Sequence, residues 1–194
     1  MNGFSRALCM AAMAAFVSAC APARVPLYLH PEWSPGELEE IVLLPIADRR
    51  ADMSEELDLE ESLRAPARSE LEDKGYRVRE LPFPDGMDSI DVAELTDDEL
   101  SDLVPEGAAG VLVVFLEDLR DEYGWKFIWL TYEFDIEVSG KLLDGDGKVV
   151  WFDRGMQTRR GGGLLEAPLT QGAAKVGAYS AAVDQLLQTL PGKN

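Results

Sequence analysis

A segment in the second half of the chain alternates strictly between apolar and polar side chains. Its apolar members are Tyr132, Phe134, Ile136 and Val138, and its polar members are Glu133, Asp135, Glu137 and Ser139. Because successive side chains of a β-strand point to opposite faces of a sheet, this period of two predicts a half-buried strand. The chain must therefore place a hydrophobic core against one face of this strand and leave the other face polar.

The residues that follow predict a β-hairpin. Asp144-Gly-Asp-Gly147 has the composition of a turn, and Lys148 to Phe152 returns as the partner strand. Asp144 and Asp146 could also suggest a calcium site, but the later glutamate of an EF-hand loop is missing. We interpret the segment as a hairpin turn, and we predict no metal site and no cofactor.

Three further segments predict strands. Ala108 to Leu116 is an almost continuous apolar run, and its valine and phenylalanine content favours a central strand buried on both faces. Ile41 to Ala47 is a shorter run of the same kind, with Pro45 expected near its end because proline cannot donate a hydrogen bond to the sheet. Tyr76 to Leu81 is a third, short strand, which Pro82 ends.

Three segments predict helices. The first runs from about Ser54 to Lys74, with Pro66 opening its second half and Gly75 stopping it. Thr96 and Glu99 have the spacing of a capping box and begin a short helix. The last helix is amphipathic, and its expected apolar stripe is Val176, Tyr179, Val183, Leu186, Leu187 and Leu190.

These elements together predict an α/β fold in one domain, residues 37–192. Hydrophobic residues make up 46% of the 194-residue chain, which is enough for one core. The expected order is β-α-β-α-β-β-β-α, with a mixed sheet of about five strands and helices packed on it.

The N-terminal residues have the features of a secretion signal. Arg6 precedes the apolar stretch Ala7 to Val17, which is too short to cross a bilayer as a helix. The stretch ends in Val17-Ser18-Ala19-Cys20, which resembles the bacterial lipobox, where small residues precede an obligatory cysteine. We therefore expect residues 1–19 to be a signal peptide and Cys20 to be lipidated. The alternative is an ordinary secretory signal cleaved after Ala19, with Cys20 left free.

Residues 20–36 are expected to form the lipidated N-terminus and a tether. Four prolines favour an extended chain, and the sixteen residues from Ala21 to Gly36 reach at most roughly 50–60 Å. Ala21 follows the cysteine in place of aspartate, which by the sorting rule of such lipoproteins favours the periplasmic face of the outer membrane. Cys9 leaves with the signal, so no disulfide is expected.

The negative net charge of the chain limits the kinds of partner that it can bind. Arg6 is the only charged residue of the signal, so its removal leaves 36 acidic residues against 17 basic ones. Nucleic acid repels so acidic a domain, and we predict no nucleic-acid partner. The expected partners are the membrane, through the lipid on Cys20, and envelope proteins. Self-association into a homo-oligomer is left open.

The candidates for catalysis or ligand binding are weak. His30 is the only histidine and lies in the tether, which excludes a Ser-His-Asp triad or a multi-histidine zinc site within one chain. Asp118, Asp121 and Glu122, beside Tyr123 and Trp125, could form a binding loop or a solvated strand connection, of which we favour the connection.

Two other groups of charged residues are also weak candidates for ligand binding. Arg159, Arg160 and Gly161 to Gly163 are expected to form a flexible loop, which could cradle an anion with its amides but lacks the lysine and the serine or threonine of a P-loop. Glu133, Asp135 and Glu137 are expected to line a solvated strand face. No catalytic residue is therefore predicted.

The order of these motifs resembles that of a known family. The stretches that carry the resemblance are VLLPIADRR, LEDKGYRV, GAAGVLVVFL, YEFDIEVSGKLLDGDGKVVW and LLQTLPG. They resemble a family of bacterial outer-membrane lipoproteins whose α/β domain is similar to the N-terminal domain of TolB and to anticodon-binding domains. The curli-secretion lipoprotein and LpoB share this design. The resemblance covers about residues 20–192, and Pro66 and the Arg159–Gly163 segment depart from it.

The resemblance implies an envelope assembly or transport component, not an enzyme. We therefore expect a lipid-anchored, periplasm-facing lipoprotein that acts as a non-catalytic accessory or scaffold subunit. The alternatives are a carboxylate-based periplasmic hydrolase and an LpoB-like activator of a peptidoglycan synthase. A tether of sixteen residues favours work near the protein's own membrane over such an activator, which must reach across the periplasm.

Overall fold

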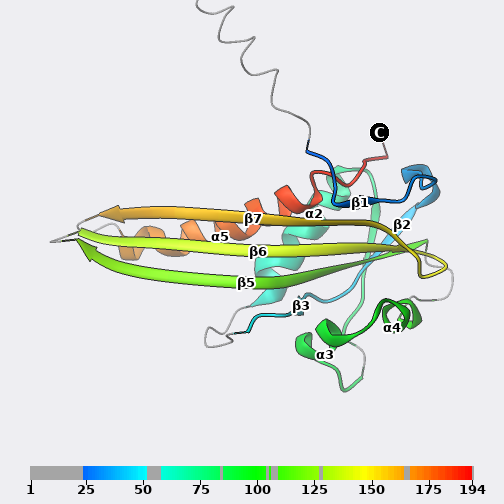
Figure 1. Cartoon of the computed structure of the whole chain (residues 1–194), viewed down its shortest axis with the longest axis horizontal. Coiled ribbons are helices and arrows are strands. Elements are labelled where there is room, and N and C mark those ends of the chain that lie inside the picture. The colour runs from blue at the N-terminus through cyan, green and yellow to red at the C-terminus, as the bar shows by residue number, and fades with distance from the viewer. Residues whose placement is uncertain are drawn as a thin grey trace, which may run out of the picture.

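Three long antiparallel strands run the length of the molecule (Figure 1). They are β5 (Gly110–Lys126), β6 (Trp129–Asp144) and β7 (Val149–Gly163). The computed structural model describes residues 24–51, 58–83, 85–103, 105, 109–126, 129–163 and 167–193. These residues form a single α/β domain with an open, mixed sheet, as the sequence predicts.

Four shorter strands complete the sheet. Strand β2 (Glu40–Leu43) lies parallel between β5 and β4 (Arg77–Glu80). Strand β3 (Ala47–Asp48) also pairs with β5, and β1 (Tyr28–Leu29) pairs antiparallel with β7. The strand order is β1-β7-β6-β5-β2-β4, so the predicted central strand is central. The two two-residue strands β1 and β3 were not predicted.

The first helix follows its sequence signals closely. A π-helical turn, η3 (Glu60–Arg64), leads into α2 (Ala65–Asp73), and Pro66 lies in the first turn of α2. Gly75 has a φ of 90°, which favours glycine, and the Tyr76 N–H donates to the Leu71 carbonyl at 3.1 Å. The predicted start of this helix at Ser54 lies outside the described residues.

Two short acidic helices, α3 (Ser89–Glu94) and α4 (Asp97–Asp102), each begin with a capping box. The box of Thr96 and Glu99 was predicted from spacing alone. Hydrogen bonds from Thr96 lower the pKa of the Glu99 carboxyl, because they stabilise its charged form. The equivalent box of Asp88 and Asp91 was not anticipated, because aspartate replaces the usual glutamate at its third position.

The larger hydrophobic core lies between one face of the sheet and the helices α2 and α5 (Ala167–Leu187). Phe134 of β6 meets Tyr179 of α5 edge to face, with ring centroids 5.4 Å apart. The predicted stripe of the last helix is buried except at its first member. Val176 is 62% exposed, because it points away from the sheet, and its assignment to the stripe was wrong.

A smaller core lies on the opposite face and is covered by α3 and α4. Its buried members include Val113 and Phe115 of β5 and Leu100 of α4. The Arg49 guanidinium lies 3.6 Å from the centroid of the Phe115 ring and closes this core at its edge. A register shift between Leu116 and Asp118 follows directly, and beyond it β5, β6 and β7 continue past α3 and α4 (Figure 1). We call these three strand segments, residues 117–126, 129–139 and 154–163, the sheet extension.

The tether expected from Ala21 to Gly36 is wrong from Arg24 onward. Tyr28 and Leu29 pair with Phe152 and Trp151 of β7, and residues 35–37 form a 3-10 turn, η2 (Pro35–Glu37). Pro26 and Pro31 flank the short strand and keep it short, because proline has no N–H to donate. The folded domain therefore includes Arg24, thirteen residues before Glu37, the start predicted from composition.

None of the helices in the described ranges is both long and apolar enough to cross a membrane.

Candidate functional site

The predicted lipidation residue, Cys20, and the signal before it lie outside the described residues. The first described residue, Arg24, is held firmly by the domain. Its guanidinium donates to the carbonyls of Gln185 and Arg154 and lies 3.3 Å from the Asp153 carboxylate. Only Ala21, Pro22 and Ala23 separate Cys20 from this anchored arginine.

Asp153 is the centre of a buried polar network. Its side chain accepts a hydrogen bond from the Thr189 hydroxyl at 2.6 Å, and that hydroxyl also lies 3.3 Å from the indole nitrogen of Trp151. Both Asp153 and Trp151 are almost fully buried. A buried carboxylate needs such partners, and Arg24 supplies the opposite charge. The network joins the N-terminal segment to β7 and to the end of α5.

The outer face of the sheet extension is the main candidate binding surface. Cross-strand pairs set which side chains share it, because directly opposed residues point to the same face. The register places Asp118 opposite Glu137, Arg120 opposite Asp135, and Glu137 opposite Met156. The residues of this outer face are Asp118, Arg120, Glu122, Glu133, Asp135, Glu137, Arg154, Met156, Thr158 and Arg160.

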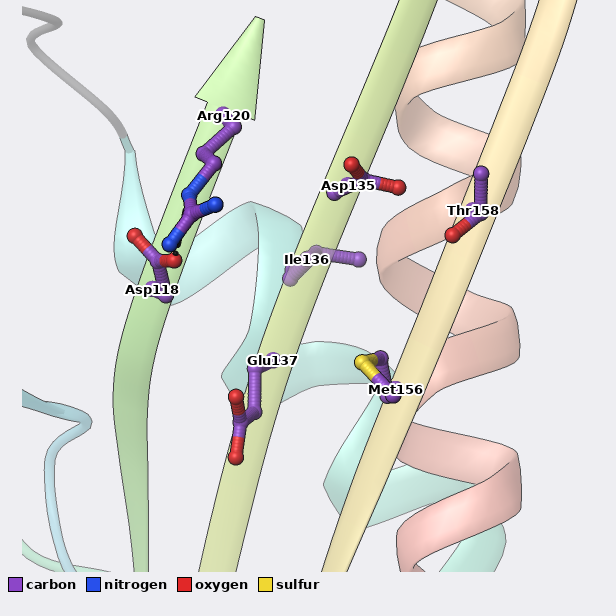
Figure 2. Close-up of a pocket in the computed structure, with 7 residues that line it drawn as sticks. All are labelled: Asp118, Arg120, Asp135, Ile136, Glu137, Met156 and Thr158. Atoms are coloured by element: carbon purple, nitrogen blue, oxygen red, sulfur yellow. Dashed lines mark ion pairs between the residues drawn. The ribbon is translucent and has the colours of Figure 1, made fainter.

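A shallow hollow of about 200 Å³ lies at the middle of this face (Figure 2). Asp118 and Arg120 on one side form an ion pair of 2.8 Å, and Asp135 and Glu137 project from β6 beside it. Met156 and Thr158 border the hollow on β7. The hollow thus combines three carboxylates, one guanidinium, one hydroxyl and one thioether.

Ion pairs between neighbouring strands flank the hollow. Arg154 Nη1 lies 3.3 Å from Glu137 Oε1, and Arg160 contacts Glu133. The contact with Glu133 raises the pKa of the Arg160 guanidinium, so this arginine stays charged. Such exposed pairs contribute little stability and exchange readily for other partners. They suit a surface that forms hydrogen bonds with a basic or polar ligand group.

The predicted binding loop at Asp118, Asp121 and Glu122 does not exist. These residues lie within β5, which continues ten residues beyond the predicted end at Leu116. Alternation along the strand splits them between the two faces. Asp118 and Glu122 belong to the outer face, whereas Asp121 points toward α5, where it pairs with Lys175 and accepts a hydrogen bond from Tyr123 at 2.7 Å. Neither the binding loop nor the solvated connection is correct.

The predicted flexible loop at Arg159 to Gly163 is also wrong, because it forms the end of β7. Gly161, Gly162 and Gly163 pair with residues of β6, so they do not form an anion-binding nest. Gly161 leaves room for the ring of Tyr132, since an added Cβ would lie 2.4 Å from that ring and the ring would have to shift.

The structure also describes three other groups of residues for which the sequence led to an expectation. The Asp144 carboxylate accepts hydrogen bonds from the N–H groups of Asp146 and Lys148, at 3.0 and 2.9 Å, which confirms the hairpin turn. His30 Nε2 lies 2.6 Å from Lys148 Nζ and is part of the N-terminal packing. Glu133, Asp135 and Glu137 line a polar strand face, as predicted.

Sequence reasoning missed the contribution of β7, namely Arg154, Met156, Thr158 and Arg160. The inward positions of this strand are Gly155, Gln157, Arg159 and Gly161, so no apolar alternation marks it. The signal that could have identified the strand is the length of its partner. In a hairpin closed at Asp144 to Gly147, the residues opposite Tyr132 to Val138 lie beyond Phe152, so the alternation favours a longer partner strand.

Comparison with known proteins gives no family. No protein-family model matches the chain, and no curated protein matches it. Solved structures of similar fold include three bacterial proteins. A PelC dodecamer from Paraburkholderia phytofirmans is 18% identical, with 84% of this chain and 95% of that chain covered and a TM-score of 0.47.

The other two are described as lipoproteins. Lipoprotein GNA1162 from Neisseria meningitidis is 18% identical, with 69% of this chain and 97% of that chain covered and a TM-score of 0.41. A minor lipoprotein from Acinetobacter baumannii is 8% identical, with coverage of 79% and 88% and a TM-score of 0.36. At such identities and TM-scores, these likenesses carry no information about the partners or activity of this chain.

Proposed function

We propose that the protein is a lipid-anchored, non-catalytic scaffold subunit of a bacterial envelope complex for transport or assembly. In this proposal Cys20 carries the lipid on the periplasmic face of the outer membrane. The sheet extension is the surface that binds a partner protein. The observation that carries the proposal is the outer face of this extension, which projects beyond α3 and α4 with Met156 62% exposed at its middle.

The chemistry of this face favours a protein ligand with a basic side chain. Asp118, Asp135 and Glu137 can accept hydrogen bonds from a lysine or arginine that enters the hollow. Met156 offers a flexible apolar contact next to them. An apolar contact surrounded by exchangeable ion pairs is the usual composition of a non-obligate protein interface.

The short link to Cys20 supports work close to the membrane. An LpoB-like activator of a peptidoglycan synthase would need a long arm to reach the inner membrane. Because Arg24 is already bound to the domain, only three residues link it to Cys20, a distance of four Cα-to-Cα steps or at most about 14 Å. This is much shorter than the sixteen-residue tether expected from the sequence, and it makes the LpoB-like alternative less favourable.

The edges of the sheet extension favour self-association. In the described part of the extension, β5 and β7 pair with no strand other than β6. Side chains of Arg24 and Gln185 cover the β7 edge at Arg154 and Met156, and no described strand pairs with the rest of this edge or with the β5 edge. From Glu117 to Glu122 the β5 edge carries four acids and one arginine, whereas from Arg154 to Arg160 the β7 edge carries three arginines and no acid. Opposite charges on two open edges suit head-to-tail contacts between copies. We include a homo-oligomer in the proposal on this ground.

Site-specific photo-crosslinking tests the partner surface. A photoreactive amino acid at Met156 should give protein adducts in intact membranes, identified by mass spectrometry. The matched control is the same amino acid at Val176, which is equally exposed at 62% but lies on the outward side of α5. Equal adducts at both positions, or none at Met156, would contradict the proposed surface.

The rival hypothesis is a carboxylate-based hydrolase. A substrate screen on the domain, positive for the natural protein and abolished by Asp135→Asn or Glu137→Gln, would replace the scaffold proposal by an enzyme. Weaker partner crosslinks in these two variants, with no detectable hydrolysis by the natural protein, would support the scaffold.

A further inference from the structure

Four exposed apolar side chains follow the first anchored residue of the domain. Val25, Leu27, Tyr28 and Leu29 are 77%, 62%, 42% and 39% exposed, respectively. We call these four residues the N-terminal strip. Tyr28 and Leu29 form the edge strand β1, so their side chains point to opposite faces of the sheet, and both are exposed along its edge. Neighbouring apolar residues exposed along one edge normally mark a contact surface, because isolated apolar residues are common on protein surfaces but clusters are not.

The N-terminal strip is held in a fixed position by contacts at both ends. Arg24 precedes it and donates to carbonyls of α5 and β7. Tyr28 and Leu29 pair with β7, and the N–H of His30 donates to the Val150 carbonyl at 2.8 Å. The domain therefore presents the strip as part of its surface.

The short chain between Cys20 and the N-terminal strip indicates that the membrane surface lies next to the strip. This step rests on the proposed lipidation of Cys20. Acyl chains on that cysteine would place its backbone at the membrane surface. Four residues then separate Cys20 from Val25, which is five Cα-to-Cα steps, so the start of the strip lies within about 18 Å of that surface in any conformation of the link.

The distribution of charge selects which side of the domain faces the bilayer. Residues 24–30 include one arginine, one histidine and no acid. In contrast, residues 88–102, which include α3 and α4, carry seven acids and no lysine or arginine. In Figure 1, these helices lie beyond β5, on the side of the three long strands away from β1. Anionic head groups repel the acidic side and leave the apolar strip as the favourable contact.

We propose that the N-terminal strip rests against the membrane and orients the whole domain on it. Strands β1 and β7 lie nearest the bilayer, and the acidic helices α3 and α4 face the periplasm. The lipid and the strip then act together, since a second contact raises the effective concentration of a surface that the anchor already holds nearby. The occupant of the strip is the lipid surface itself.

Fluorescence quenching in vesicles tests this orientation. The mature protein, acylated at Cys20, has no other thiol, because Cys9 is removed with the signal peptide. Leu27→Cys and Asp98→Cys therefore each introduce one site for an environment-sensitive fluorophore. The probe membrane is phosphatidylcholine with anionic phosphatidylglycerol, and it contains nitroxide-labelled lipid. The label at position 27 should be quenched several-fold more than the label at position 98, and its emission should shift to the blue.

A charge in the strip provides the matched variant. Val25→Asp, at the most exposed position of the strip, should reduce quenching at position 27 toward the level at position 98, with the circular dichroism spectrum unchanged. Equal quenching at positions 27 and 98 of acylated protein would overturn the orientation. Disulfide formation between copies at position 27, with no lipid quenching, would assign the strip to a second copy instead.

The mass of the purified protein separates the two proposals. Acylated protein without differential quenching overturns the orientation and leaves the proposed anchor intact. Protein without acyl chains overturns the anchor, and the orientation fails with it.

Discussion

Arg24 and Asp153 lie 129 residues apart in the chain, and their side chains meet with Nη2 3.3 Å from Oδ1. The carboxylate is almost completely buried, whereas the guanidinium is partly open to solvent. This pair joins the beginning of the folded domain to β7, and through Thr189 to the segment after α5. The N-terminal segment is thus part of the fold, although its composition is typical of a linker.

Replacement of Asp153 and replacement of Arg24 should lower the free energy of unfolding by different amounts. Asp153→Ala removes the partner of Arg24 and of the Thr189 hydroxyl, and we expect a loss of about 2–3 kcal/mol in the free energy of unfolding. Arg24→Ala should cost less, about 1 kcal/mol, because Asp153 keeps the hydrogen bond from Thr189 and water can enter the partly exposed site that the guanidinium leaves. Urea denaturation of both variants and of the double variant gives the coupling between them. A larger loss for Arg24→Ala would contradict this account of the network.

A second prediction concerns the contact between β7 and α5. A Cβ at Gly155 would lie 2.2 Å from the Ala182 carbonyl oxygen and 2.9 Å from the Leu186 nitrogen. Gly155→Ala should therefore push the helix away from the sheet and destabilise the domain by about 1–3 kcal/mol. Gly177→Ala in the same helix has no neighbour within 4 Å and should stabilise by about 0.5–1 kcal/mol. Thermal denaturation distinguishes the two, and a neutral Gly155→Ala would show that α5 is not so tightly packed.

This close contact also explains why the sequence revealed only half of the three long strands. The segments around Phe134 and Val113 carry ordinary strand patterns, because their side chains fill a core. The far half of β7 places Gly155 and Gly161 toward the core side, where the α5 backbone and the Tyr132 ring take the space of a side chain. Because those positions carry no apolar side chains, the sequence of β7 shows no hydrophobic periodicity from which the strand could be predicted.

The same limit applies to the candidate surface. Glu133, Asp135 and Glu137 could be assigned to one polar face from their alternation alone. Their neighbours Arg120 and Met156 could not, since cross-strand register depends on the bulge after Leu116 and on the length of β7. The N-terminal strip was missed for a related reason. Its prolines predict an extended chain, and nothing local indicates that this chain pairs with β7.

Alkaline pH should destabilise the domain through Tyr76. Its hydroxyl donates to the Pro191 carbonyl at 2.6 Å, and burial raises the pKa of the phenol to about 12. In the unfolded chain the phenol ionises near its ordinary pKa of about 10. Between these values the unfolded state has lost the proton that the folded state keeps, so stability falls as pH rises from about 10 to 12.

Tyr76→Phe isolates this contribution. The variant should lose about 1 kcal/mol at neutral pH with the hydrogen bond, but it should show a weaker decline above pH 10 than the natural protein. Unfolding free energies across the alkaline range measure both effects. The tyrosinate absorbance of folded protein, compared between the two, reports the titration directly. Parallel declines in both proteins would mean that other groups, and not Tyr76, control alkaline unfolding.

The last prediction concerns the proposed lipid anchor at Cys20. If the lipobox resemblance is functional, Cys20→Ala should abolish incorporation of labelled fatty acid, because the Cys20 thiol is the group that accepts the diacylglyceryl chain. The variant should then leave the membrane fraction for the soluble periplasmic fraction, while the domain remains folded, since Cys20 precedes the first anchored residue, Arg24. Cys9→Ala is the matched control, because it removes the other thiol of the chain within the apolar stretch, and it should leave both labelling and fractionation unchanged. Natural protein that takes up no label, together with a Cys20→Ala variant that stays in the membrane, would instead favour an ordinary secreted protein bound there by its partners.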